Sequence, residues 1–349
     1  MAKLRIVHVG LGGWGGNWAT HVLPFHPDIE PVGYVELVGE KRQAFAQRLN
    51  QPLAMFHQDL DAALKAGPVD AVTIAVPIAM HEPVARHALE AGKHVIVEKP
   101  FTRTIEEAQG LVALAEQKGL VLAVSQNYRY YPAAQQVAHF ARGQIFGKLI
   151  GGKLDFRRNN TQAKSGTGNT NWPDPMVADM AVHHYDLMRM IADADPVDVS
   201  ARSWNPPGSP YAQDPCTTMT LGFPGGAHLS YRGSWVDPGP QTPWSGEWQL
   251  DFERASVVWT GRGAEPLQLA RDRVQIRWPH EELADVPLEP YPLHDRAGVL
   301  HAFAETIRTG VEPPFFPSGK ANLGTLATIE AALESAKAGG AAVKLETLL

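Results

Sequence analysis

A glycine-rich turn near the N-terminus constrains the fold more than any other feature of the sequence. Residues 4–9 form a short apolar run, LRIVHV, that is typical of a buried parallel strand. The turn follows at once and reads G-x-G-x-x-G, and a helix is predicted over 17–23. This order indicates a turn whose backbone N–H groups approach the pyrophosphate of a dinucleotide, although a merely tight strand–helix turn is an alternative. The predicted cofactor contacts in the turn are Gly10, Gly12, Gly13, Trp14 and Gly15.

The rest of the first third of the chain alternates between strand-like and helix-like segments. Apolar, β-branched runs predict strands over 31–36, 70–76, 94–97 and 120–124. Helical spacing predicts helices between them, over 39–50, 59–66, 81–91 and 105–118. This alternation is typical of a parallel, doubly wound α/β sheet, so we expect a Rossmann domain that binds NAD(P) over residues 1–125.

The pattern changes beyond about residue 150, where strand-like segments dominate. Strands are predicted over 149–157, 197–204, 217–223, 227–235, 248–252, 256–260 and 274–278, and helices over 177–191, 298–309 and 321–337. We expect an α+β domain with a mainly antiparallel sheet over residues 126–349, whose last helices can pack back on the first domain.

Composition narrows the class of protein. A chain of 349 residues exceeds the size of one hydrophobic core, which favours two domains. The net charge of −6 argues against a nucleic-acid binder, and the single Cys216 excludes an internal disulfide and a multi-cysteine metal site. There is no apolar run of membrane-spanning length and no room for a signal peptide before the first strand, so we expect a cytoplasmic protein without a membrane partner.

Glu36 bears on the choice of cofactor. It ends the second predicted strand, about 20 residues after the glycine turn, where a carboxylate accepts hydrogen bonds from the adenosine ribose and repels a 2′-phosphate. NAD is therefore favoured. NADP is not excluded, because Lys41 and Arg42 follow closely and either is long enough to reach a phosphate.

Two further motifs carry candidate catalytic groups. Glu98-Lys99-Pro100 directly follows the strand 94–97, at the sheet edge where doubly wound folds bind ligands. Asp179 and His183 are spaced i and i+4, which on a helix puts them on one face, with Asp186 nearby and His184 pointing elsewhere. A carboxylate beside an imidazole suits a general base, and a metal site of Asp179, His183 and Asp186 is a less favoured alternative.

These motifs together resemble the Gfo/Idh/MocA family, named for glucose–fructose oxidoreductase, inositol dehydrogenase and a rhizopine catabolism protein. The resemblance covers nearly the whole chain. It rests on the glycine turn and on segments 69–72 (VDAV), 91–100 (AGKHVIVEKP) and 179–186 (DMAVHHYD), and on the pattern from Phe303 through Gly310 to the helix that holds Ser335.

The resemblance implies an N-terminal Rossmann domain and a C-terminal domain with a large open sheet used for homo-oligomerisation, as a dimer or tetramer. It implies that Lys99 binds the reacting hydroxyl or carbonyl, that His183 accepts the proton and that Asp179 supports His183. A share of the base role for Lys99 stays an open alternative. Glu98 would lie near the nicotinamide ribose, and Lys99–Pro100 is expected to be cis. Asn127 and Arg129 match positions where the family often has a polar residue and an arginine.

Other positions depart from the family pattern. The family's Pro-Asn-x-x-His is here Pro77-Ile-Ala-Met-His81, without the asparagine, and Pro77 and His81 are retained as predicted cofactor contacts together with Glu98, Lys99 and Asn127. Trp172-Pro173 replaces a frequent Trp-Arg. The candidate substrate contacts are Arg129, Arg157, Asn160, Trp172 and His184, and no metal is expected.

The expected activity is hydride transfer between NAD(P) and a secondary alcohol or ketone of a sugar, polyol or related cyclic alcohol. Two alternatives stay open. One is an NAD-dependent glycosidase that uses transient redox chemistry, and the other is a non-catalytic nucleotide-binding sensor or regulator.

Overall fold

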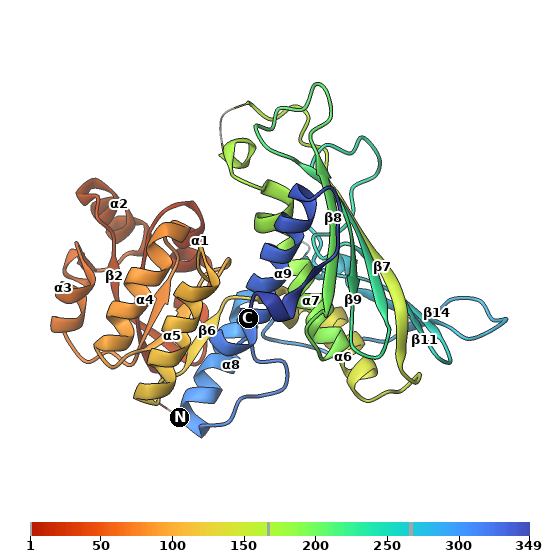
Figure 1. Cartoon of the computed structure of the whole chain (residues 1–349). Helices are drawn as coiled ribbons and strands as arrows, with labels where there is room; N and C mark the ends of the chain where they lie inside the picture. Colours follow the sequence, from red (N-terminus) through yellow and green to blue (C-terminus); the bar gives the residue numbers. More distant parts are fainter. Residues whose placement is uncertain (1, 166–167, 265–267) are drawn as a thin grey trace. The chain divides into compact units, whose positions relative to one another are not determined.

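The structure is a computed structural model that describes residues 2–165, 168–264 and 268–349 (Figure 1). The chain divides into two compact units. The first comprises Met1–Asn127 and Asp295–Leu323, and the second comprises Tyr128–His294 and Gly324–Leu349. Within the described residues, no helix combines the length and the apolar character needed to cross a membrane.

A six-stranded parallel sheet forms the centre of the first unit. Its strand order is β3 (Phe56–His57), β2 (Ile29–Val35), β1 (Leu4–Val9), β4 (Ala71–Ile74), β5 (His94–Val97) and β6 (Leu122–Val124). The chain proceeds from β1 to one side of the sheet and returns to β4 on the other. This reversal beside β1 creates the crevice at the carboxyl ends of the strands where such sheets bind ligands.

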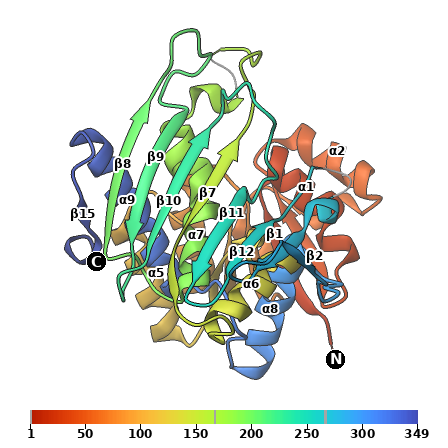
Figure 2. The ribbon, with the colours of Figure 1, turned by 90° about the vertical axis from the view of Figure 1, so that its right-hand side faces the viewer.

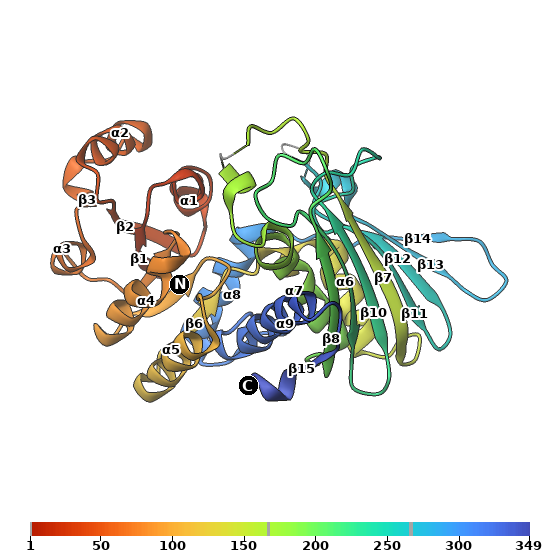
Figure 3. The same ribbon diagram turned by 45° about the horizontal axis from the view of Figure 1, so that its top comes forward.

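Helices cover both faces of this sheet. They are α1 (Gly13–His21), α2 (Gly39–Leu49), α3 (Leu60–Lys65), α4 (His81–Glu90), α5 (Ile105–Lys118) and α8 (Asp295–Thr309). Helices α1 and α2 lie on one face and α4 and α5 on the other, as right-handed crossovers require (Figure 3). Local sequence sets the ends of α5: the Thr104 side chain accepts the Glu107 N–H, and Gly119 ends the helix at φ +64°.

A nine-stranded sheet forms the second unit. Its order is β14 (Ala284–Val286), β13 (Arg273–Arg277), β12 (Ser256–Thr260), β11 (Glu247–Phe252), β7 (Leu149–Arg157), β10 (His228–Ser234), β9 (Cys216–Gly222), β8 (Asp198–Trp204) and β15 (Val343–Lys344). Neighbouring strands are antiparallel except for the parallel pair β7 and β10.

Among the described residues, the helices of the second unit pack against one face of its sheet. They are α6 (Pro132–Arg142), α7 (Ala181–Ala192) and α9 (Gly319–Lys337), the last of which begins in residues of the first unit. In Figure 2 the sheet faces the viewer and α6, α7 and α9 lie behind it. Strand β10 shows the resulting alternation, because Leu229 and Tyr231 are buried while Ser230 and Arg232 are exposed on the open face.

The predicted fold class, a Rossmann sheet with a second, mostly antiparallel open sheet, is confirmed. Two helix predictions were wrong in detail. Helix α1 begins at Gly13 rather than at 17, because the end of the glycine turn is already helical. The predicted helix over 177–191 is a π-helical segment, Pro175–Met180, followed by α7 from Ala181. Helix α6 was not predicted, although Pro132 at its first position is a helix-start signal.

Candidate active site

The glycine turn leads from β1 into α1 in the way that the sequence predicts. Gly10 has φ +102°, and a Cβ there would lie 2.4 Å from the Ala75 carbonyl oxygen. A Cβ on Gly15 would lie 2.2 Å from the Gly10 carbonyl oxygen. Both positions therefore require glycine. Beneath the turn, the buried His8 imidazole bonds the Thr73 hydroxyl (2.7 Å) and the Gly15 carbonyl (3.0 Å).

A cleft of about 680 Å³ opens at the carboxyl ends of β1, β2 and β4. Most of the predicted cofactor contacts line it together, namely Gly10, Gly12, Gly13, Trp14, Gly15, Glu36 and Pro77. Lys41 also lines it. The cleft thus joins the glycine turn to the acidic end of β2, as a site for the adenosine and pyrophosphate of a dinucleotide requires.

Glu36 is held in place by backbone amides. Its two carboxylate oxygens accept the N–H groups of Leu11 (3.2 Å) and Val38 (3.0 Å), which ties the glycine turn to the end of β2. Arg42, which the sequence leaves as a candidate phosphate contact, donates to the carbonyl oxygens of Glu36 (2.5 Å) and Leu37 (2.9 Å). Lys41 and His87 are among the residues that line the cleft.

His81 joins two loops at the same sheet edge. Its Nε2 faces the Val76 carbonyl (2.9 Å) and its Nδ1 faces the Pro100 carbonyl (2.9 Å), and the side chain is buried. The Lys99–Pro100 peptide bond is cis, as the resemblance implied. His81 therefore links the segment after β4 to the Glu98-Lys99-Pro100 motif, and its contact with a cofactor stays a prediction.

Glu98 accepts a hydrogen bond from the indole of Trp18 in α1. The Oε1–Nε1 distance is 2.6 Å, and both side chains are buried. Arg296 packs near both tryptophans of α1: its guanidinium carbon lies 4.3 Å from the Trp14 ring centroid and 5.5 Å from that of Trp18. Arg296 Nη1 is buried with no hydrogen-bond partner among the described residues. Sequence reasoning missed Arg296 because α8 adds it to this unit from a distant part of the chain.

Asn127 lies at the end of the first unit's main segment, where its side-chain amide donates to Asp295. Asp295 begins α8 with φ +56°. Asn127 thus joins the segment that follows β6 to the start of α8. Its partner Asp295 directly precedes Arg296. A cofactor contact by Asn127 stays a prediction.

In the second unit, the imidazole of His183 stacks on the phenol ring of Tyr128. Their ring centroids are 3.9 Å apart and their planes differ by 4°. Tyr128 in turn receives a hydrogen bond from Arg262 (3.0 Å), whose guanidinium carbon lies 4.7 Å from the ring centroid. His183 is on α7, whereas Asp179 precedes it in the π-helical segment. The two residues thus lie on either side of the junction between the π-helical segment and α7, and their pairing stays a prediction.

Arg129, a candidate substrate contact, forms a buried ion pair with Asp186. The two bonds, Nε to Oδ2 and Nη2 to Oδ1, are both 2.6 Å long. Burial lowers the pKa of Arg129, but the charge of Asp186 outweighs it and the pKa is raised. The pair joins the segment before α6 to α7, which gives Arg129 a structural role.

His184 is also fully buried within the second unit. Its Nδ1 bonds the Tyr231 hydroxyl (3.1 Å) and its Nε2 bonds the Trp244 carbonyl (3.0 Å). Burial lowers the pKa of His184 to about 4. Both nitrogens are thus used to attach α7 to the sheet and to the loop that holds Trp244.

The other candidate substrate contacts, Arg157, Asn160 and Trp172, share no hydrogen-bond partner with one another in the contacts among described residues that follow. Arg157 bonds Asp155 and Glu247, and the Asn160 amide donates to the Tyr211 hydroxyl (3.0 Å). Trp172 is 47% exposed, so its ring is available to a ligand. Among the residues described, no group of three or more His, Cys, Asp or Glu side chains is arranged to hold a metal ion.

Comparison with known proteins places these features in a family. Residues 4–126 match a family model described as "Oxidoreductase family, NAD-binding Rossmann fold". Residues 134–258 match one described as "GFO/IDH/MocA C-terminal domain". The two matches span the glycine turn, the Glu98-Lys99-Pro100 motif, Asp179 and His183.

Individual relatives are similar over almost the full length. An uncharacterized protein of Sinorhizobium fredii is 25% identical over 347 residues, covering 96% of this chain and 94% of that protein. A D-apiose dehydrogenase of Paraburkholderia graminis is 25% identical, covering 91% of this chain and 84% of that protein. The crystal structure of an inositol dehydrogenase homologue from Azotobacter vinelandii, complexed with NADH and myo-inositol, has a TM-score of 0.82 at 17% identity and covers 98% of both chains.

Proposed function

The chain belongs to the Gfo/Idh/MocA family of NAD-binding oxidoreductases, and we propose that it oxidises a secondary alcohol of a sugar, polyol or related cyclic alcohol, or reduces the corresponding ketone. One observation carries the cofactor half of this proposal. The glycine turn and Glu36 line one cleft at the carboxyl edge of a parallel sheet. A carboxylate at that position favours NAD over NADP, since it would repel a 2′-phosphate.

The substrate class is taken from relatives. By its name, the D-apiose dehydrogenase of Paraburkholderia graminis acts on a sugar. The structure of the Azotobacter vinelandii inositol dehydrogenase homologue is described as a complex with myo-inositol, a polyol. A secondary alcohol with neighbouring hydroxyl groups is the chemistry that these two share. We infer that the substrate of this chain also carries such a group.

We assign the chemical steps to three side chains. Bound NAD⁺ supplies the hydride acceptor. His183 takes the hydroxyl proton as the C–H bond breaks and the carbonyl forms, and Lys99 donates a hydrogen bond to the same oxygen as negative charge develops on it. Asp179 stabilises the imidazolium that results. In the reverse direction, His183 returns the proton to the carbonyl oxygen.

The surroundings of His183 support its assignment as the base. Its ring stacks on Tyr128 with the centroids 3.9 Å apart, which restrains the plane of the imidazole. Glu98, which precedes Lys99, is tied to Trp18, and this contact supports the backbone that carries the lysine. We also propose that the Arg296 cation partly neutralises the negative charge of the cofactor's phosphates, because Arg296 packs on Trp14 of the glycine turn.

The proposal also covers the oligomeric state of the protein and its place in the cell. The open face of the nine-stranded sheet, where Ser230 and Arg232 are exposed, is our candidate surface for a homodimer or tetramer. We also propose that the protein is cytoplasmic. Size-exclusion chromatography with light scattering tests the first statement, and a mass of 38.0 kDa in solution would refute it.

The test of the activity is a screen of polyols, aldoses and inositols with NAD or NADP, followed by NADH absorbance. Once a substrate is found, Lys99→Ala and His183→Ala are expected to lower kcat by about 100-fold or more while NAD affinity is retained. Lys65→Ala and His139→Ala, at exposed positions of the two units, serve as matched controls. Full activity in both site variants would refute the catalytic assignment.

A further inference from the structure

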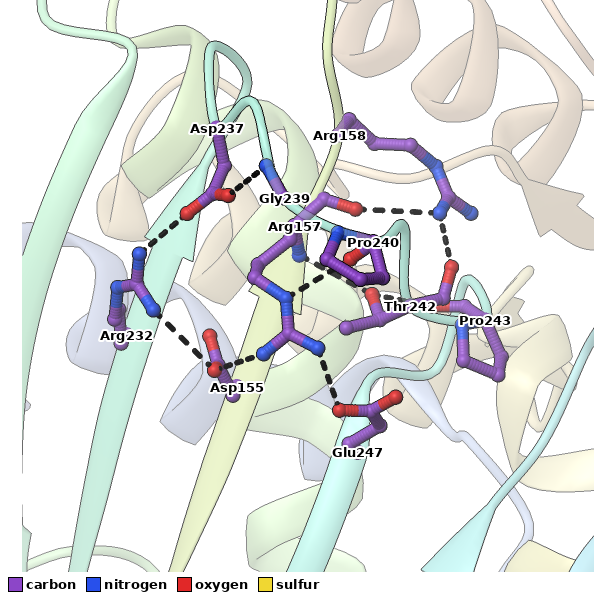
Figure 4. A network of polar contacts seen from close by, with 10 residues as sticks. All are labelled: Asp155, Arg157, Arg158, Arg232, Asp237, Gly239, Pro240, Thr242, Pro243 and Glu247. Atoms are coloured by element: carbon purple, nitrogen blue, oxygen red, sulfur yellow. Dashed lines mark hydrogen bonds and ion pairs between the residues drawn. The ribbon is translucent and has the colours of Figure 1, made fainter.

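Two adjacent arginines at the end of β7 have opposite surroundings (Figure 4). Arg157 lies on the open face of the sheet, where it bonds Glu247 (2.7 Å) and Asp155. Arg232 on the neighbouring β10 bonds Asp155 (3.4 Å) and Asp237. Arg157 and Arg232 are thus both paired with carboxylates.

Arg158 points to the other side and is 7% exposed. Its Nη1 donates to the carbonyl oxygens of Arg157 (3.3 Å) and Thr242. Its guanidinium carbon lies 4.1 Å from the Trp244 ring centroid and 5.4 Å from that of Phe156. Among the described residues, no carboxylate contacts this guanidinium. Figure 4 shows its other terminal nitrogen directed away from the network.

A buried guanidinium without a counter-ion is unusual, because the loss of hydration is compensated by only carbonyl groups and aromatic rings. Burial accordingly lowers the pKa of Arg158 to about 10. The group remains charged at neutral pH. The hydrogen bonds of this guanidinium to described residues all come from Nη1, so its other N–H groups can donate to an anion that reaches it from solution.

This cation is connected to the proposed base through aromatic contacts. The Trp244 ring that packs on Arg158 also lies 5.6 Å from the guanidinium carbon of Arg262. Arg262 bonds Tyr128, and Tyr128 stacks on His183. Arg262 thus contacts both Trp244, which packs on Arg158, and Tyr128, which stacks on His183.

An acidic side chain, Asp272, lies in the β12–β13 connection that holds Arg262. Its oxygens accept the backbone N–H groups of Arg262 (2.9 Å) and Ala133 (3.2 Å). Burial raises the pKa of Asp272 to about 6. Its carboxylate is therefore used to hold the backbone of the β12–β13 connection.

We propose that Arg158, assisted by Arg262, binds an anionic group of the substrate beside the Tyr128 and Trp244 rings. The substrate is then a sugar or polyol that carries a carboxylate or a phosphate, rather than a neutral one. This inference rests on the proposed function, because it treats His183 as the base of the same site. Arg158 acts as a specificity-determining residue, and its charge attracts the end of the substrate that does not react.

The test compares matched compounds with NAD: glucose with glucuronate and glucose 6-phosphate, and myo-inositol with its 1-phosphate. We expect kcat/KM for one anionic class to exceed that of its neutral counterpart by at least tenfold. Arg158→Met is expected to remove about 10- to 100-fold of kcat/KM for the anionic compound through KM, and Arg158→Lys to restore part of it. Arg273→Met, which removes an exposed arginine paired with Asp285, is the control for net charge.

Direct binding separates this inference from the proposed function. If no compound is oxidised, but NADH-saturated protein binds glucuronate or inorganic phosphate and Arg158→Met weakens that binding tenfold, the subsite stands and the activity fails. If neutral compounds are oxidised as well as anionic ones by the unaltered protein, the subsite is refuted while the activity stands. That comparison needs no variant, so it decides the matter even if Arg158→Met does not fold. A preference for carboxylate over phosphate, or the reverse, identifies the anion.

Discussion

Replacing Arg129 with methionine separates the two roles that sequence and structure give to this side chain. The resemblance makes Arg129 a candidate substrate contact, whereas the structure pairs it with Asp186. The guanidinium and carboxylate are 6% and 1% exposed and share two hydrogen bonds of 2.6 Å. Arg129→Met preserves the length of the side chain but leaves the Asp186 charge buried without its partner.

The expected cost follows from this burial. Removing one partner of a buried ion pair destabilises a protein by about 3–5 kcal/mol. Thr325 offers little compensation, since its hydroxyl is 3.4 Å from the Asp186 oxygen. For a domain of 150–250 residues, such a loss lowers the melting temperature by roughly 6–20 °C.

Tryptophan fluorescence during thermal and urea unfolding measures the effect, because seven of the nine tryptophans lie beyond residue 150. The double variant Arg129→Met/Asp186→Leu, which removes both charges, is expected to recover on the order of half of the lost stability. An unchanged melting temperature in Arg129→Met, together with a raised KM for substrate, would refute the structural role and restore the predicted substrate contact.

Three further predictions concern the first unit and the buried histidines. Gly12→Ala is expected to weaken NAD binding but to leave the melting temperature unchanged, because no atom lies within 4 Å of the added methyl group. Gly15→Ala is expected to lower the melting temperature, because the added methyl group overlaps the Gly10 carbonyl oxygen. Steady-state kinetics should show Glu36→Ser raising KM for NAD about tenfold and lowering KM for NADP, and unchanged cofactor preference would refute the role of the carboxylate. The pKa of His8 and of His184 is about 4 in the folded protein, below the unfolded value of about 6.5. Unfolding therefore takes up protons between these values, and the free energy of unfolding should fall as pH drops from 6.5 to 4, by up to about 3 kcal/mol for each imidazole; urea titrations that show no such fall would contradict this.

Regular elements of the first unit were predictable because each carries its own signals. The 105–118 helix has a capping threonine before it and Gly119 after it, and the structure has the same bounds. The cofactor cleft could be predicted equally well, because the glycine spacing and the acidic residue at the end of a strand are local sequence patterns.

The surroundings of the catalytic candidates were not predictable in this way. Stacking of Tyr128 on His183 and the approach of Arg262 join three separate parts of the chain. No periodicity links such residues, because tertiary packing alone brings them together. The sequence also does not show which arginine is buried in an ion pair. The pairing of Arg129 with Asp186 was therefore not predicted, and a substrate contact by Arg129 stays a prediction.

The central claim is that Lys99 and His183 serve one reacting oxygen. A crystal structure of the protein with NADH and a bound, unreactive substrate analogue tests it most directly. The account predicts that the Lys99 ammonium and a His183 ring nitrogen both lie about 3 Å from the same analogue oxygen. An analogue that contacts only one of them, with the other facing a different cavity, would contradict the account.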